Sequence, residues 1–275
     1  RTQRWEAVKL HAEPTTHRMR WIKTADGKWG LVVVPLHGRG NKNGEGAGVK
    51  VLLYHKPDDL RAEWKTELID ASMHMTHNFD IARVDAAFSG RTAMLAIGGR
   101  EGIAHFRWRD GIWQRRVLAA NEGAEDGCRG VGELRVGRLG QAEGEFVASV
   151  EPMHGNELAV YVNLPKEESA KPTRIKLTDK LVEGHALACG DLLGLGSDQI
   201  VVGWRGNPSK AGAKVGIQLW TPLDPEGAKW RETLIDDNTM ACEDLVLADL
   251  DADGKLEIIA AGRATKNLKV YFNER

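Results

Sequence analysis

The amino-acid sequence predicts an all-β fold, a β-propeller of four-stranded blades. Short apolar runs separated by Gly, Asp, Asn and Pro dominate the chain, and long helical patterns are missing. A Trp-containing strand pattern recurs at intervals of about 50 to 60 residues, within the range of a propeller blade with long loops. The last repeat contains an Asp-rich turn between two short strands. A β-sandwich is the alternative, but it does not explain a repeat whose two ends complement each other.

The recurring pattern is a Trp, then basic or polar residues, then an aliphatic end. Four copies carry the Trp, and a fifth begins with Pro instead: Trp5–Leu10, Trp64–Ile69, Trp113–Leu118, Trp230–Ile235 and Pro172–Leu177. Three further strand-like runs lie between successive copies, which gives four strands per unit. Units of this size, repeated radially, are typical of propellers.

Five repeats follow from this count. We place them approximately at residues 11–73, 74–123, 124–182, 183–240 and 241–275 plus 1–10, as one domain over 1–275. The last repeat lacks its Trp-type strand and the chain begins with one. We therefore expect the N-terminal strand to complete the last blade and close a five-bladed ring. Six or seven blades are expected if the chain is a fragment.

Composition excludes several classes of partner. The formal net charge is −1 over 275 residues, so a bulk electrostatic affinity for nucleic acid is not expected. No apolar stretch approaches the ~18 residues of a membrane span, so membrane insertion is not expected either. Three cysteines cannot all pair, and the chain is not a disulfide scaffold: Cys128, Cys189 and Cys242.

Aligning the repeats places one titratable residue at the start of each innermost strand. These residues are His17, His77, Glu133, His185 and Glu243. Innermost strands line the axis of a propeller, so the five side chains are expected to form a ring. A histidine at a strand start is commonly a hydrogen-bonded structural residue, and that interpretation stays open for each one singly.

A second set follows the second strand of each unit, where a basic side chain stands beside Gly. Its members are His37 with Arg39, Arg100, His154, Arg205 and Arg263. Arg supplies a planar fork that suits carboxylates and vicinal hydroxyls. Both sets together predict a polar pocket at one mouth of the ring. Turn chemistry inherited through duplication is the alternative explanation for the repeated Gly-Arg pairs.

The segment from Asp249 to Glu257 predicts a calcium loop. Asp249, Asp251 and Asp253 alternate before Gly254, and Glu257 follows four residues after the third Asp. A hard cation that takes six to eight oxygen ligands suits this spacing. The other repeats keep only decayed versions, so we expect one structural calcium site. A solvated acidic turn is the alternative.

The histidines also allow a transition-metal site. His17, His77 and His185 come from separate blades and would converge at the axis, and imidazoles with a carboxylate suit zinc or a similar divalent ion. A zinc ion or another divalent ion in the central pocket is therefore a second expectation.

The segment Ala248–Ile258 resembles the FG-GAP/VCBS propeller repeat. A fuller set of motifs resembles a bacterial VCBS-propeller group: Thr-His17-Arg-Met-Arg, Leu-His37-Gly-Arg39, Thr-His77-Asn-Phe-Asp, Gly-His185-Ala, Cys-Glu243-Asp-Leu and Gly-Arg263-Ala-Thr. That group is similar to the propeller part of aldos-2-ulose dehydratase. Its full members are larger, with about two more blades N-terminal to this region. The resemblance implies export to a secreted or periplasmic location in bacteria, calcium-type loops and carbohydrate substrates.

The resemblance also implies a reaction, elimination of water or of a sugar leaving group next to a keto group. His77 and His185 are then the expected base and acid, His17 is their partner or a metal ligand, and Arg39 and Arg100 are substrate clamps. The remaining members of the two sets, His37, His154, Arg205, Glu243 and Arg263, are expected to bind a sugar or oligosaccharide. The competing hypothesis is a non-catalytic propeller that binds glycans or a protein partner.

Overall fold

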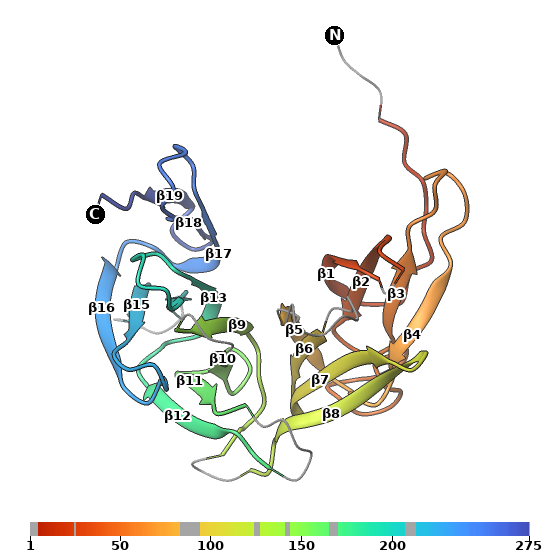
Figure 1. Cartoon of the computed structure of the whole chain (residues 1–275), viewed down its shortest axis with the longest axis horizontal. Coiled ribbons are helices and arrows are strands. Elements are labelled where there is room, and N and C mark those ends of the chain that lie inside the picture. The colour runs from red at the N-terminus through yellow and green to blue at the C-terminus, as the bar shows by residue number, and fades with distance from the viewer. Residues whose placement is uncertain are drawn as a thin grey trace.

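The computed structural model describes residues 5–24, 26–82, 94–123, 127–140, 144–164, 170–206 and 213–274. These residues form antiparallel strands and no helix, so none of them belongs to a helix able to span a membrane. The strands build five consecutive sheets, which confirms the predicted five-bladed propeller. Figure 1 shows the sheets side by side in chain order around a common centre.

Four of the sheets contain four strands each, arranged in simple sequence order. The first comprises β1 (Thr16–Lys23), β2 (Trp29–Pro35), β3 (Val51–His55) and β4 (Thr66–Asp70). The second comprises β5 (Thr76–Ala82), β6 (Met94–Gly99), β7 (Gly102–Arg109) and β8 (Ile112–Ala120). The third comprises β9 (Leu134–Leu139), β10 (Gly144–Glu151), β11 (Glu157–Val162) and β12 (Thr173–Thr178). The fourth comprises β13 (Gly184–Gly190), β14 (Gln199–Trp204), β15 (Gly216–Pro222) and β16 (Trp230–Asp237).

The fifth sheet has three strands in the described part of the chain, β17 (Cys242–Ala248), β18 (Glu257–Gly262) and β19 (Asn267–Tyr271). The predicted N-terminal strand is not among them, so the expected closure of the last blade by residues 5–10 is wrong. Residues 5–15 contain no strand, and the side chain of Trp5 is 94% exposed.

Contacts with the first blade explain where the N-terminal segment lies instead. Leu10 packs on a small apolar cluster of the first sheet. The hydroxyl of Tyr54 donates to the carbonyl of His11 (2.8 Å), and Arg61 pairs with Glu6 (2.8 Å). Glu13 is buried and accepts from Arg39 (3.3 Å). Leu10 and the charged side chains of the segment therefore bind to the first blade, whereas Trp5 stays exposed to solvent.

Alternation along each inner strand packs one blade against the next. Separate apolar clusters fill the first-to-second, second-to-third, third-to-fourth and fourth-to-fifth interfaces. Their centres are fully buried side chains such as Phe79, Phe106, Phe146 and Ile200. Burial of such side chains supplies about 1.5–3 kcal/mol each relative to exposure. The blades are therefore held by cores between sheets, and the inner strands are left to carry polar groups toward the axis.

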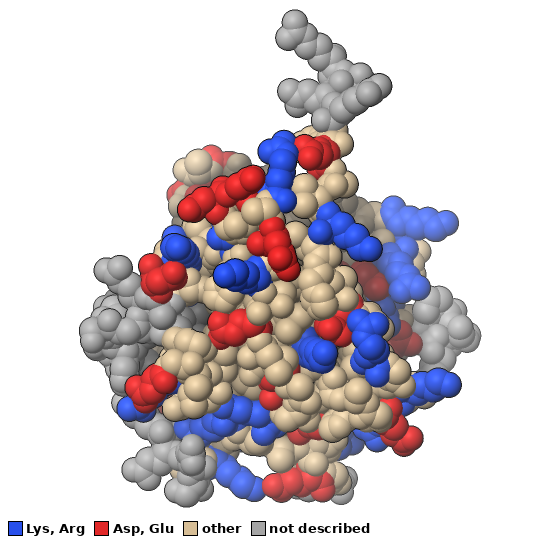
Figure 2. All heavy atoms as spheres, turned by 90° about the vertical axis from the view of Figure 1, so that its right-hand side faces the viewer, with Lys and Arg blue, Asp and Glu red and all other residues tan. Residues whose placement is uncertain are grey.

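The surface of the first two blades carries both signs of charge. In the face shown in Figure 2, Lys and Arg side chains are interspersed with Asp and Glu, with apolar and neutral side chains between them. Charges mixed in this way do not build a strong field of one sign over that face.

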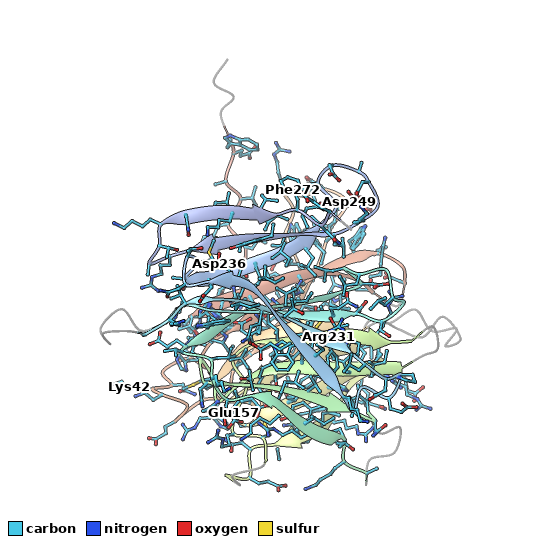
Figure 3. All side chains as sticks on the ribbon, turned by 90° about the vertical axis from the view of Figure 1, so that its left-hand side faces the viewer. Lys42, Glu157, Arg231, Asp236, Asp249 and Phe272 are labelled. Carbon is cyan, nitrogen blue, oxygen red and sulfur yellow. The ribbon has the colours of Figure 1, made fainter. Side chains whose placement is uncertain are left out.

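A buried carboxylate joins the fourth and fifth blades. Asp236 near the end of β16 is 5% exposed and accepts from the backbone and hydroxyl of Thr239 (2.8 and 2.7 Å), from the Tyr271 hydroxyl (2.7 Å) and from Lys269 (3.0 Å). Figure 3 labels it. Burial on its own would raise the pKa of Asp236, but the bonds from Thr239, Tyr271 and Lys269 lower it to about 2.

We predict that Asp236→Asn destabilises the protein by about 1–3 kcal/mol at neutral pH, because buried donors lose a charged acceptor. The folded-state pKa lies below the unfolded value, so the contribution is complete above about pH 4 and disappears as pH falls through about 2. Thermal unfolding of wild type and variant across that range should show the difference in Tm shrinking toward low pH. Asp237→Asn, at an exposed neighbour, is the control and should change Tm little. A difference in Tm that does not depend on pH would contradict the assignment.

Candidate functional site

Four of the five innermost strands carry the same irregularity. The pairing register of β1, β5, β13 and β17 with the next strand shifts at one residue, between Thr16 and Arg18 and at the equivalent places in the other three. The residues skipped by the ladder are His17, His77, His185 and Glu243. A β-bulge bends its strand and re-aims a side chain. The repeat thus turns one polar residue per blade at the same height, and Glu133 stands at the equivalent place just before β9.

Histidines from three adjacent blades meet in one cluster. His77, His154 and His185 each offer a ring nitrogen, and these nitrogens lie within 4.8 Å of one another. The Nε2 atoms of His77 and His154 are 2.8 Å apart. The ring of His17 lies 4.7 Å from that of His77, and the ring of His185 lies 4.6 Å from that of His154. Two members of the predicted trio, His77 and His185, belong to the converging set, whereas His154 stands in the third place and His17 borders the set beside His77.

Backbone carbonyls of the next blade orient two of these rings. Nδ1 of His77 lies 2.9 Å from the carbonyl oxygen of Gly132, and Nδ1 of His185 lies 2.5 Å from that of Glu243. A carbonyl only accepts, so each Nδ1 donates a proton to it, and Nε2 is the ring nitrogen that faces the cluster. Metal-binding histidines commonly donate their second ring nitrogen in this way. The donor set therefore fits a divalent transition ion such as zinc.

Glu133 is a buried carboxylate next to His77 of the cluster. It is 1% exposed, lies 3.2 Å from Nδ1 of His77, and accepts from Asn78 and Arg18. Burial would raise its pKa, but the hydrogen bond from His77, Arg135, the charge of His77 and Arg18 together lower the pKa to about 2. The carboxylate therefore stays ionised beside the rings.

The second carboxylate of the cluster is Glu243. Its Oε1 accepts from Arg205 (2.9 Å) and from Arg263 (3.4 Å) and lies 3.8 Å from Nε2 of His185. Its Oε2 is buried and has no hydrogen-bond partner among the described residues. Burial raises the pKa of Glu243, and Arg205, His185 and Arg263 outweigh it and lower the pKa. Arg205 is held in turn by Glu183 (3.1 Å).

Two histidines of the cluster are held in the neutral form. Desolvation comes first for both and lowers the pKa of His17 and of His154 to about 4. The repulsion that a protonated His77 would exert lowers the pKa of both further, followed by Arg18 for His17 and by His185 for His154. Neutral imidazoles offer the lone pairs that a metal ion or a substrate proton requires.

Members of the second predicted set divide into two groups. His154, Arg205 and Arg263 reach the cluster, as described above. Arg39 instead pairs with Glu13, and Arg100 donates to the carbonyl of Asn43 (2.6 Å) in the glycine-rich loop after β2. His37 bridges to Met75 through its backbone, and its buried Nδ1 has no hydrogen-bond partner in the described part of the chain. The structure does not place His37, Arg39 or Arg100 among the contacts of the cluster, and their roles as clamps or substrate ligands stay predictions.

Sequence reasoning missed several residues of this site. Arg18, Asn78 and Glu183 each bind a carboxylate or guanidinium of the cluster. All three are direct neighbours of a ring residue or lie two positions before it, which is a usable signal. His154 was expected only as a sugar ligand, because its place in a loop gave no sign that it would face His77.

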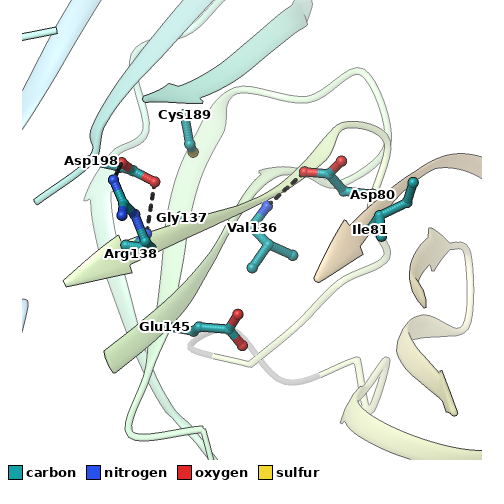
Figure 4. A pocket seen from close by; sticks show the side chains of 8 residues that line it. All are labelled: Asp80, Ile81, Val136, Gly137, Arg138, Glu145, Cys189 and Asp198. Carbon is teal, nitrogen blue, oxygen red and sulfur yellow. Dashed lines mark hydrogen bonds and ion pairs between the residues drawn. The ribbon is translucent and has the colours of Figure 1, made fainter. Parts of the chain in front are cut away.

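A cavity of about 210 Å³ opens farther along the inner strands (Figure 4). Its lining includes Asp80, Val136, Arg138, Cys189 and Asp198. Asp80 accepts from the backbone N–H of Val136 (3.0 Å) and Asp198 from that of Arg138 (2.9 Å), so the two carboxylates tie β9 to both neighbouring blades. Burial raises the pKa of the Cys189 thiol well above its usual value, which makes it a poor nucleophile. The histidine cluster therefore remains the stronger candidate site.

The acidic loop lies far from the histidines. Glu243 is the second residue of β17 and Asp249 follows the end of that strand, roughly 20 Å farther along at 3.3 Å per residue. Carboxylates of Asp249, Asp251 and Glu257 come within 4.8 Å of one another, and Figure 3 labels Asp249 in this loop. Asp253 instead pairs with Lys255 (2.9 Å). The loop thus gathers three of the four predicted ligands.

Comparison with known proteins identifies relatives of this chain. A family model described as the β-propeller domain of aldos-2-ulose dehydratase matches residues 1–164. Aldos-2-ulose dehydratase from Phanerodontia chrysosporium is 26% identical over 205 residues, covering 67% of this chain and 22% of that protein. The match therefore spans about a fifth of the relative's length. It confirms the predicted resemblance to the dehydratase propeller, whereas the FG-GAP/VCBS label stays a prediction.

Proposed function

Because the chain belongs to the aldos-2-ulose dehydratase β-propeller family, we propose that its histidine cluster binds a divalent metal ion and eliminates water next to the keto group of a sugar. The relative's name speaks of dehydration of an aldos-2-ulose. The observation that carries the proposal is the convergence of His77, His154 and His185, two of them with Nδ1 committed to backbone carbonyls.

The elimination removes two groups from neighbouring carbons of the sugar. A base takes the proton from the carbon next to the keto group, and the electron pair forms an enolate. The enolate then expels the hydroxyl group of the following carbon, which leaves as water once it has gained a proton. The products are an enone and one water molecule. A divalent ion at the cluster would polarise the keto oxygen and stabilise the enolate.

The residues of the chain divide these tasks by their contacts. His77 and His185 were expected to be base and acid, but their Nδ1 atoms are hydrogen-bonded to carbonyls and their Nε2 atoms face the cluster. We therefore assign both, with His154, to metal binding. His17 lies beside them, is partly open to solvent, and makes no hydrogen bond or ion pair with the described residues. It is our candidate general base.

Guanidinium groups supply positive charge around the same place. Nη2 of Arg18 makes a long hydrogen bond of 3.5 Å to Glu133. Its Nε is buried and has no partner among the described residues. Arg205 and Arg263 frame Glu243 on the other side. These groups are placed to hold sugar hydroxyls and to stabilise an enolate oxygen.

We predict that the wild-type protein binds Zn²⁺ or Co²⁺ and that His77→Ala, His154→Ala and His185→Ala each weaken binding by at least about tenfold, since each removes one ligand. Isothermal titration with Zn²⁺ and the visible absorption of Co²⁺ measure this without a substrate. His55→Ala is the matched control, because His55 lies on β3 and pairs with Glu67. Equal affinity in all four variants would rule out the cluster as the metal site.

We also predict that the metal-loaded protein converts an aldos-2-ulose into a product with the ultraviolet absorption of an enone. His17→Ala should lower kcat by about 10²–10⁴-fold, the usual contribution of a general base, and leave Zn²⁺ affinity near the wild-type value. If the sugar binds but no enone forms, the protein is a carbohydrate-binding propeller. That result would favour the competing function and end the catalytic proposal.

The acidic loop supports a separate proposal, a structural calcium ion at Asp249, Asp251 and Glu257. Clustered carboxylates repel one another, and a hard cation offsets this repulsion. Some of their oxygens already accept from backbone N–H groups of Gly254 and Leu250, which shapes the loop around the carboxylates. The alternative is a solvated acidic turn that these hydrogen bonds hold without a bound ion.

We predict that millimolar Ca²⁺ raises the Tm of the wild-type protein, as binding to the folded state requires. Asp251→Asn should abolish the increase. Asp253→Asn serves as the matched control, since Asp253 faces Lys255 and should keep most of the effect. An equal response of both variants would contradict the proposed ligand set.

A further inference from the structure

The loop that carries His154 begins and ends in buried carboxylates. Glu151 is the last residue of β10 and Glu157 the first residue of β11, and they stand directly opposite each other in the strand ladder. Their side chains are 0% and 4% exposed. Like charges directly opposite each other destabilise a strand pair. The five residues between them, 152–156, hold His154 in the cluster.

One guanidinium binds both carboxylates. Arg174 on β12 donates to Oε2 of Glu151 (2.9 Å) and to Oε2 of Glu157 (2.7 Å), and its Nε donates to Glu151 as well (3.2 Å). Its side chain is 10% exposed. Arg129 adds a contact to Oε1 of Glu157. Arg174 therefore links the two residues that flank the loop, Glu151 and Glu157.

The remaining oxygen of Glu151 is also occupied. The hydroxyl groups of Ser149 (2.6 Å) and Tyr161 (2.7 Å) donate to its Oε1. The hydrogen bonds named here all end on Glu151 or Glu157, the two residues that flank the loop. None of these residues belongs to the histidine cluster. The network can therefore influence the cluster only through the position of the loop that carries His154.

Energetics argue that this network serves position more than stability. Desolvation makes buried ion pairs a weak source of stability, and well-packed apolar groups of similar size often do as well or better. Glu157 and Glu151 nevertheless sit at the two strand ends that aim His154. Its Nε2 lies 2.8 Å from that of His77, so a shift of the loop would move His154 relative to the other two rings.

We propose that Arg174 is a positioning residue that fixes His154 in the cluster by joining Glu151 to Glu157. The proposal rests on the proposed function for its effect on metal binding. The placement of His154 is a property of the folded protein alone, and it can be measured without metal.

The test compares Arg174→Met with Lys176→Met. Lys176 lies two residues along the same strand and pairs only loosely with Asp179 (3.7 Å), so it is the matched control. Arg174→Met should increase the rate of His154 modification by diethylpyrocarbonate several-fold, read by mass spectrometry, and should weaken Zn²⁺ binding by at least about tenfold. Lys176→Met should change neither.

A thermodynamic cycle separates positioning from general damage. In a His154→Ala background, Arg174→Met should no longer lower Zn²⁺ affinity, because the ligand it positions is absent. An additive loss would show that Arg174 acts elsewhere. Wild-type modification rate and wild-type affinity in Arg174→Met would overturn the proposal.

Arg174→Met leaves buried Glu151 without a cation and Glu157 with Arg129 alone, and so carries a risk of misfolding. The triple variant Glu151→Gln, Glu157→Gln, Arg174→Met removes the three charges together and avoids that penalty. It should also expose His154 to modification, and protection equal to wild type would refute the positioning role. If the wild-type protein binds no Zn²⁺ or Co²⁺, the proposed function fails, while the modification rates still decide the role of Arg174.

Discussion

A hydrogen bond from one blade to the backbone of the next underlies the site. The bulge at His77 turns its ring out of the β5 ladder, and the carbonyl of Gly132 then fixes the ring. His185 repeats the arrangement with the carbonyl of Glu243 one interface later. Each ring is thus held by a neighbour that belongs to a different sheet. The site depends on the blades being packed at the right spacing, and the apolar cores between sheets set that spacing.

The repeat was readable in the sequence because each blade must bury the same faces. The Trp pattern marks the outermost strands or the residues just before them, as Trp64 before β4 and Trp113 in β8 show. The same regularity made His17, His77 and His185 predictable as a ring. The prediction that the strand at Trp5 completes the last blade was wrong, because a strand-like pattern does not determine which part of the protein the segment contacts. Contacts with the first blade decided that.

The second set was predictable only in part, because it lies in loops. Strand periodicity fixes where a side chain points, whereas a loop side chain follows local contacts. Arg205 and Arg263 directly follow the second strands of their blades, β14 and β18, and reach Glu243. Arg100 supports the long loop after β2 instead, by bonding to the carbonyl of Asn43. Nothing in the repeat pattern distinguishes these outcomes, since they are decided by the lengths and partners of the loops.

The third blade contributes in a way that the others do not. It supplies Glu133 at the ring position and His154 from the following loop, so one sheet provides both a ligand candidate and the carboxylate beneath it. A bulge suffices to aim His77 or His185, because a strand already constrains the backbone on both sides. His154 has no ladder to constrain it, and the buried network of Glu151, Glu157 and Arg174 stands where that ladder ends. In the proposed arrangement, the repeat supplies the position of His154 and a polar clamp at the ends of β10 and β11 holds the loop that carries it.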